Sequence, residues 1–176
     1  MSRRRPVLAL LAALAGATGP ALASGEPAVM DDARPLLDLV DRLVGARPLT
    51  AAGTGRLVGA TLAPVGELST ERKLVYAAAA PGFTRVELRL PGPRSTHAGQ
   101  FLLLEVAGPA CVTMAQVEAR HGAGEPSVPT PRQPADAPLY LRYPHDWGSL
   151  AFGFARVGPP CLKTVAIDFA PAAAGK

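Results

Sequence analysis

The sequence predicts an α+β fold, in which an antiparallel sheet of about six strands has two or three short helices packed on one face. Short segments with helical spacing and clear end signals indicate the helices. Six short apolar segments, one of which alternates cleanly with charged residues, indicate the strands. The order helix, strand, strand, strand occurs twice behind one further helix, so the domain is interpreted as two such repeats.

The chain begins with the features of an export signal. Arg3–Arg5 form a positively charged region, residues 7–15 are apolar, and Ala21–Ala23 has the small-x-small pattern of a signal-peptidase site. The apolar run is shorter than the roughly 20 residues that span a bilayer as a helix. No cysteine near the cleavage point offers a site for lipid. We therefore expect residues 1–23 to be removed, giving a bacterial periplasmic or secreted protein without a stable membrane anchor.

The mature protein is expected to hold one domain. Residues 24–30 are predicted to be disordered, residues 31–170 to form a single globular domain, and residues 171–176 to form a loose tail. The signal carries three of the 18 Lys and Arg residues and none of the 14 Asp and Glu residues, so the mature charge falls from +4 to +1. A nearly neutral protein with no basic cluster argues against a nucleic-acid partner.

Only two cysteines occur, and an exported protein meets an oxidising compartment. Cys111 and Cys161 are therefore predicted to form a disulfide, which would close a loop of about 50 residues and stabilise the fold by roughly 4 kcal/mol. The alternative is a redox or nucleophilic thiol. Neither cysteine belongs to a C-x-x-C motif, and a nucleophilic thiol would have to stay reduced.

The first helix is predicted to follow Asp31 or Asp32 as its N-cap and to end with Gly45 at the C′ position. Between these signals, apolar residues recur at helical spacing. They are Leu36, Leu37, Leu39, Val40, Leu43 and Val44. This pattern predicts an amphipathic helix of about three turns.

Two shorter helices have matching end signals. Thr50 is the expected N-cap of the second helix, and Gly59 would end it. In the third, Thr113 and Gln116 have the spacing of a capping box, and Gly122 can take a left-handed C′ conformation. Local chemistry alone therefore predicts a helix over residues 114–121.

Strands are predicted at residues 74–78, 84–90, 100–106, 139–143, 149–157 and 162–169. The second is the clearest, because Val86, Leu88 and Leu90 would point to one face and Arg85, Glu87 and Arg89 to the other. Residues 100–106 are interpreted as a largely buried strand. Five prolines between residues 122 and 138 predict that this segment is an exposed loop without regular structure.

The repeat appears at an offset of 63 residues. Residues 49–52 with Gly59 then fall on residues 112–115 with Gly122, and both read as an apolar residue, a Thr cap, a short helix and a glycine. At nearly the same offset, residues 74–78, 84–90 and 100–106 correspond to residues 139–143, 148–154 and 162–168. The identities are few, so duplication and chance similarity both explain them.

The capped helix of residues 112–122, VTMAQVEARHG, is followed by antiparallel strands and resembles the unit of SmpA/OmlA-type envelope assembly proteins. The tandem arrangement is similar to that of the β-lactamase inhibitory proteins. This resemblance implies an exported, non-catalytic protein that works by binding other proteins. It carries over no binding residue. The lipid-bearing cysteine of the assembly lipoproteins is missing, and the sequence has only one candidate disulfide.

The three histidines are the first candidates for chemistry. None of His97, His121 and His145 lies at metal-ligand spacing from another, so neither a metal site nor a cofactor is expected. His121 is interpreted as a cation at a helix C-terminus, where it would interact favourably with the helix dipole. No glycine-rich phosphate loop is present.

Two groups of residues are candidates for binding. His145, Asp146 and Trp147 lie between two predicted strands, as a tight turn in which Trp147 covers the sheet or as a loop that presents an acid, an imidazole and an indole together. The charged side of residues 84–90 is either a solvated strand face or a recognition face. Its members are Arg85, Glu87 and Arg89.

The sequence thus predicts an exported, soluble, non-catalytic domain that binds another envelope or secreted protein, such as an inhibitor, an immunity protein or an assembly factor. One alternative is a small envelope hydrolase using His145 with Asp146, which requires both side chains to converge on a pocket with Ser149 or another hydroxyl. The other is a small-ligand carrier, which requires an apolar cavity under the sheet.

Overall fold

A computed structural model of the protein describes residues 33–96, 98–108, 111–127, 130, 134 and 136–170. The predicted export signal, the segment 24–30, the tail 171–176, Asp31, Asp32 and His97 lie outside these residues.

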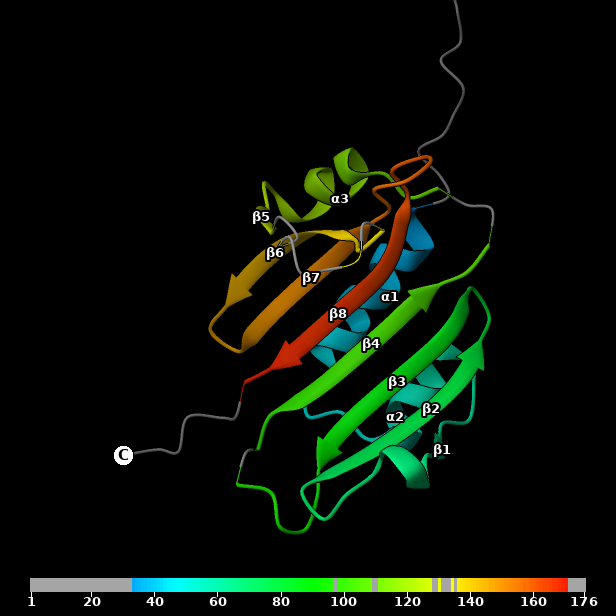
Figure 1. Cartoon of the computed structure of the whole chain (residues 1–176), viewed down its shortest axis with the longest axis vertical. Helices are drawn as coiled ribbons and strands as arrows, with labels where there is room; N and C mark the ends of the chain where they lie inside the picture. The colour runs from blue at the N-terminus through cyan, green and yellow to red at the C-terminus, as the bar shows by residue number, and fades with distance from the viewer. Residues whose placement is uncertain are drawn as a thin grey trace, which may run out of the picture.

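Within the described residues, eight antiparallel strands form one sheet in the order β1-β2-β3-β4-β8-β7-β6-β5 (Figure 1). Their bounds are β1 (Ala63–Pro64), β2 (Lys73–Ala80), β3 (Phe83–Pro91), β4 (Gln100–Val106), β5 (Glu125–Ser127), β6 (Leu139–His145), β7 (Gly148–Phe154) and β8 (Leu162–Phe169). The α+β class is confirmed, and all six predicted strands are present.

The predicted count of about six strands is too low because β1 and β5 have only two and three residues. β5 lies inside the proline-rich segment, where the prediction of no regular structure is wrong for residues 125–127. Pro126 is tolerated there because β5 has only β6 as a neighbour among the described strands, and a strand at an edge can lack one backbone donor.

The described part of the protein also forms three α-helices, α1 (Arg34–Gly45), α2 (Ala51–Val58) and α3 (Met114–His121), with a 3₁₀ turn, η1 (Gly66–Leu68). In α2, the Thr50 hydroxyl accepts from the Gly53 N–H, and in α3 the capping box of Thr113 and Gln116 forms as predicted. α1 differs from its prediction. Its N-cap residue, Ala33, makes no side-chain cap hydrogen bond, and Gly45 is its last residue rather than its C′ residue.

One hydrophobic layer holds the helices against a single face of the sheet, as Figure 1 shows with α1 and α2 behind the strands. Val86 and Leu88 of β3 are fully buried in this layer, and Arg85, Glu87 and Arg89 point to the other face as predicted. The members of the layer that are 0% exposed are Val40, Leu43, Val86, Leu88, Leu102, Leu104, Val117, Phe152, Val165 and Ile167.

From each edge to the centre, the strands follow in chain order, β1-β2-β3-β4 in one half and β5-β6-β7-β8 in the other, and β4 pairs with β8 at the centre. Each half contains one capped helix followed by four strands: α2 with β1–β4, and α3 with β5–β8. Leu103 and Ala166 face each other at the centre and are separated by 63 residues, as are the caps Thr50 and Thr113. Each half thus contains the predicted helix and three strands, with one further short strand between them that was not predicted, and duplication stays a prediction.

The predicted disulfide is present. Cys111 and Cys161 are bonded, with their Cα atoms 4.9 Å apart. The bond joins the segment just before α3 to the segment just before β8, so it lies in the second half of the molecule. Among the residues that the structure describes, no helix is long and apolar enough to cross a bilayer.

Candidate binding face of the sheet

The face of the sheet opposite the helices, here called the open face, is turned toward the viewer in Figure 1. Strand register places rows of side chains across it, two of which run through Glu87 and Arg89. One row runs Ala77, Glu87, Leu103, Ala166 and Ala151, and the other runs Val75, Arg89, Phe101, Asp168 and Ser149. The open face therefore combines small and apolar side chains with charged ones, three of which, Arg85, Glu87 and Arg89, lie together on β3.

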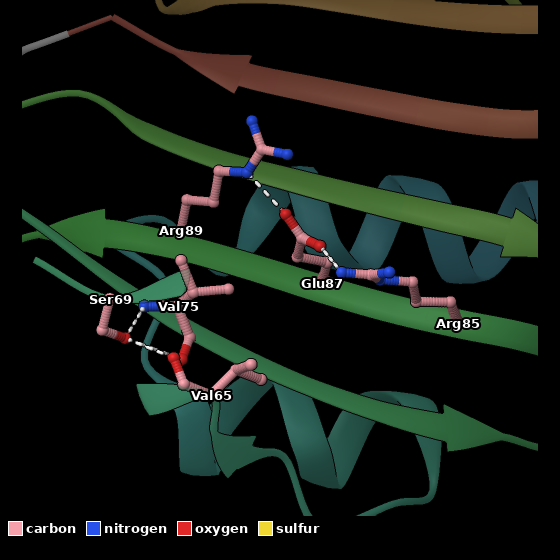
Figure 2. Close-up of polar contacts among 6 residues, drawn as sticks. All are labelled: Val65, Ser69, Val75, Arg85, Glu87 and Arg89. Atoms are coloured by element: carbon pink, nitrogen blue, oxygen red, sulfur yellow. Dashed lines mark hydrogen bonds and ion pairs between the residues drawn. The ribbon is translucent and has the colours of Figure 1, made fainter. Parts of the chain in front are cut away.

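Glu87 is the centre of that charged group. It accepts a hydrogen bond from Arg89 Nε at 2.6 Å and a second from Arg85 Nη2, and Figure 2 shows it between the two guanidinium groups. Glu87 is only 3% exposed, so the interpretation of these residues as a solvated strand face is wrong for the carboxylate. The flanking arginine side chains remain about two-fifths exposed, at 39% for Arg85 and 42% for Arg89.

The charge state of Glu87 follows from opposing effects. Burial raises the pKa of the carboxyl, but the hydrogen bond and charge of Arg89, together with those of Arg85, outweigh burial and leave the pKa below its ordinary value. The carboxylate is thus ionised at neutral pH and holds both guanidinium groups in place. Arg89 Cζ also lies 4.9 Å from the centre of the Phe101 ring.

The edge of the sheet beside this group is fixed by Ser69. Its hydroxyl donates to the Val65 carbonyl at 2.8 Å and accepts from the Val75 N–H at 3.0 Å, as Figure 2 shows. The Val65 N–H in turn donates to the Val75 carbonyl at 2.8 Å. These bonds continue the edge of β2 beyond the short strand β1, so the strand next to β3 is held along its length.

The second predicted group lies elsewhere. The His145 ring stacks on Trp147 with centroids 4.7 Å apart, and Arg47 Cζ lies 5.0 Å from the centre of the indole. Trp147 also packs on Phe169, at 5.4 Å between ring centroids, and joins the core layer on the helix-covered side. This agrees with the interpretation of a turn in which Trp147 covers the sheet, while Asp146 is exposed.

The structure does not bring the two predicted groups together. His145 follows Leu141 and Tyr143 on the helix-covered face, whereas the arginines of β3 lie on the open face. Ser149 is also on the open face, opposite Asp168 in register. Because His145 and Ser149 project from opposite faces, Ser149 is not placed to act as a nucleophile with His145, and a hydrolase that uses another hydroxyl stays a prediction.

His121 is not the helix-end cation that we expected. Its ring packs between Tyr143 and Phe152, at centroid distances of 5.7 and 5.1 Å, and its Nε2 is buried with no hydrogen-bond partner among the described residues. This burial lowers the pKa of the imidazole, so the neutral form is favoured. The cation that ends α3 is Arg120, which pairs with Asp38 and Asp41 of α1.

An apolar cavity of about 250 Å³ lies between α1 and the sheet, lined among others by Leu36, Leu39, Phe83 and Val106. Ligand sites usually occupy roughly 300–1,000 Å³ and carry a few polar groups, so this cavity gives the carrier alternative little support. Within the described ranges, no group of three or more His, Cys, Asp or Glu side chains could hold a metal ion.

Comparison of the sequence and fold with protein-family models, with curated proteins and with solved structures finds no match. The resemblance to the envelope assembly proteins and to the β-lactamase inhibitory proteins therefore stays a prediction.

Sequence reasoning missed the apolar part of the open face, which comprises Phe101 and Leu103 of β4 with Ala166 and Ala151 beside them. Residues 100–106 are apolar on both faces, which predicts a strand covered on both sides. The structure shows Phe101 and Leu103 only half-buried. The alternation of residues 84–90 was the available signal, because a strand with a charged face implies that its neighbours expose the same side.

Proposed function

We propose that this protein is an exported, non-catalytic domain that binds another protein through the open face of its sheet. The observation that carries the proposal is the ion group of Arg85, Glu87 and Arg89, whose carboxylate is buried although α1, α2 and α3 pack on the other face. The partner would be another envelope or secreted protein, bound as a target to inhibit, a toxin to neutralise or a component to assemble.

The cost of burying Glu87 supports this proposal. Removing a carboxylate from water is unfavourable, and a paired buried ion contributes little net stability compared with an apolar residue. Here the arrangement fixes two guanidinium groups that would otherwise be mobile. Immobilising side chains before association lowers the entropy lost on binding, and arginine beside aromatic residues is common at interface centres. Arg89 over Phe101 has this composition.

Export is supported by the Cys111–Cys161 bond, because disulfides persist mainly in oxidising compartments. Ser149 and His145 lie on opposite faces of the sheet, which favours the binding proposal over a hydrolase that uses this pair.

The test uses a side chain that obstructs the open face without removing a contact. Ala166 lies at its centre between Leu103 and Ala151, so Ala166→Arg would block docking. The matched control is Ala119→Arg on the exposed surface of α3. Immobilised wild type and both variants would be compared for proteins retained from an envelope extract, and the affinity of each retained protein would then be measured in purified form.

We expect Ala166→Arg to lower the affinity for the retained partner by about tenfold or more and Ala119→Arg to leave this affinity unchanged. Equal unfolding midpoints for the two variants would show that the fold is intact. Retention of the same partner by all three proteins with equal affinity, or retention of none, would contradict the proposal.

A further inference from the structure

A pocket of about 340 Å³ lies at one end of the open face, where β2 and β4 begin and β3 and β8 end. Its lining combines aromatic and aliphatic side chains of neighbouring strands with four charged side chains. The main lining residues are Arg72, Lys73, Arg89, Pro91, Phe101 and Asp168.

The charges in this pocket do not balance. Three cations face one acid, Asp168. Arg89 uses its Nε to bind Glu87, and Figure 2 shows both of its Nη groups pointing away from that carboxylate. Among the residues that the structure describes, Arg72 and Lys73 have no ion-pair partner. The pocket thus offers a positive surplus with donors free to bind an anion.

Hydrogen bonds fix the backbone that carries Arg72 and Lys73. The Thr70 hydroxyl accepts from the N–H groups of Arg72 and Lys73 at 3.3 and 3.2 Å, and the Gly92 N–H donates to the Arg72 carbonyl at 3.0 Å. A Cβ atom at Gly92 would lie 2.5 Å from the Glu71 carbonyl oxygen, so only glycine allows this approach. The turn before β2 and the turn after β3 are thereby fixed against each other.

We propose that this pocket binds a carboxylate of the protein partner, with Arg89, Lys73 and Arg72 as its counter-charges. The inference rests on the proposed function of the open face. Carboxylates are the negative groups of an unmodified polypeptide, so they are the anions that a protein partner on the open face would bring to this positive surplus. The apolar walls at Pro91 and Phe101 suit the short aliphatic stem that carries a carboxylate in a polypeptide.

The carboxylate can come from an acidic residue or from the C-terminal end of a polypeptide, and three matched probes distinguish these sources. N-acetylglutamate α-amide carries only the side-chain carboxylate, N-acetylglutamine carries only the α-carboxylate, and N-acetylglutamine amide carries neither. Each would be titrated into the ¹⁵N-labelled mature protein at low salt, where exposed charges are least screened. We expect one or both acids, and not the neutral amide, to shift the backbone amides of Lys73, Ser95 and Phe101.

Lys73→Gln is expected to raise the concentration for half-maximal shift by about fivefold, the effect of losing one partly exposed ion pair. The matched control, Lys163→Gln, makes the same change at an exposed position on β8 outside this pocket and should leave the titration unchanged. Equal shifts with the neutral amide, equal effects of the two lysine substitutions, or tighter binding of inorganic phosphate than of both acids would overturn the proposal.

Failure here is distinguishable from failure of the proposed function. If Ala166→Arg abolishes partner binding while the acids do not bind the pocket, the open face is the interface and the carboxylate site is wrong. If the acids bind but Ala166→Arg has no effect on any retained protein, the pocket is an anion site without the proposed interface, which also overturns the assignment of its ligand to a partner on this face.

Discussion

The two halves of the molecule tie the start of a helix to the start of a central strand in different ways. In the first half, the Gln100 side chain at the beginning of β4 accepts from the Leu49 N–H at 2.7 Å and donates to the Leu49 carbonyl at 2.9 Å. In the second half, the Leu162 N–H at the beginning of β8 donates to the Val112 carbonyl at 2.9 Å, and the disulfide lies one residue earlier on both segments.

Leu49 and Val112 each precede the Thr cap of their helix, so the two connections occupy corresponding places. Both link the helix to one of the two strands at the centre of the sheet. The comparison shows that the fold requires this connection, whereas the chemistry that supplies it is free to differ. One half uses two neutral hydrogen bonds, and the other uses a main-chain bond with a covalent link.

Removing the covalent link is the largest expected change. Cys111→Ala with Cys161→Ala opens a loop of about 50 residues and should lower the free energy of unfolding by roughly 4 kcal/mol, because the unfolded protein regains the entropy that the bond removes. Urea denaturation of the variant and the wild type would measure the difference. Wild-type protein in a strong reductant should approach the variant, and an unchanged midpoint in both would contradict the prediction.

Removing the amide from the first half is expected to cost about 2 kcal/mol. Gln100→Ala eliminates both side-chain bonds to the backbone of Leu49, a residue that is 3% exposed, and each such bond contributes about 1 kcal/mol. Urea denaturation again provides the measurement.

Gln100→Glu sharpens this test. The ionised carboxylate can accept from the Leu49 N–H but cannot donate to the Leu49 carbonyl. The loss of stability relative to the wild type should therefore be larger at pH 7 than at pH 4, where the carboxyl becomes protonated and can donate. Loss of stability that is the same at pH 7 and pH 4 would show that the connection depends on packing rather than on the pair of hydrogen bonds.

The smallest expected effect concerns the last residue of each capped helix. Position 121 in α3 corresponds to Val58 in α2, which is buried, whereas His121 carries an imidazole whose pKa is lowered by burial. In the unfolded protein the imidazole has its ordinary pKa of about 6.5, so as the pH is lowered the unfolded protein binds a proton at a higher pH than the folded protein does. Stability should therefore fall as the pH decreases from 7.5 to 5.

His121→Val should remove this part of the pH dependence while changing stability at pH 7.5 by less than about 1 kcal/mol. His121→Gln serves as the control, since it keeps a polar side chain but binds no proton in this range. Unfolding curves at several pH values would measure both, and a slope that persists in both variants would contradict the assignment to His121.

The same comparison extends to the open face. On β3 and β7, corresponding core positions carry Val86 and Leu150, then Leu88 and Phe152, all of them buried. Between them, Glu87 of β3 corresponds to Ala151 of β7, and the arginines of β3 have only Ser149 and Gly153 as counterparts. Packing keeps the core positions apolar in both halves. The open face differs between the halves, so binding residues that only one half carries would lie on that face.

Much of the fold could be predicted because its signals are local. The capping residues of α2 and α3 and the alternation of β3 depend on neighbours within a few residues, and the structure has them as predicted. The strands β1 and β5 were not predicted because each is too short to show an alternating pattern, and both contain a proline.

The candidate site could be predicted only in part, because its properties depend on register. The sequence places Arg85, Glu87 and Arg89 on one face, but the burial of Glu87 depends on how its neighbours on the same strand fold over it. The exposure of Phe101 depends on the described helices lying on the other face. The pocket with Arg72 and Lys73 forms where the ends of four strands come together in the fold, and no local pattern in the sequence predicts this.

The two short outer strands have a consequence for the behaviour of the protein in a crowded compartment. A sheet edge offers unpaired backbone groups that can template the strand of another molecule, and long flat edges promote polymerisation. Here β1 and β5 have two and three residues, with Pro64 in one and Pro126 in the other. A sheet that closes both edges in this way can leave its open face exposed to a partner without also recruiting copies of itself edge to edge.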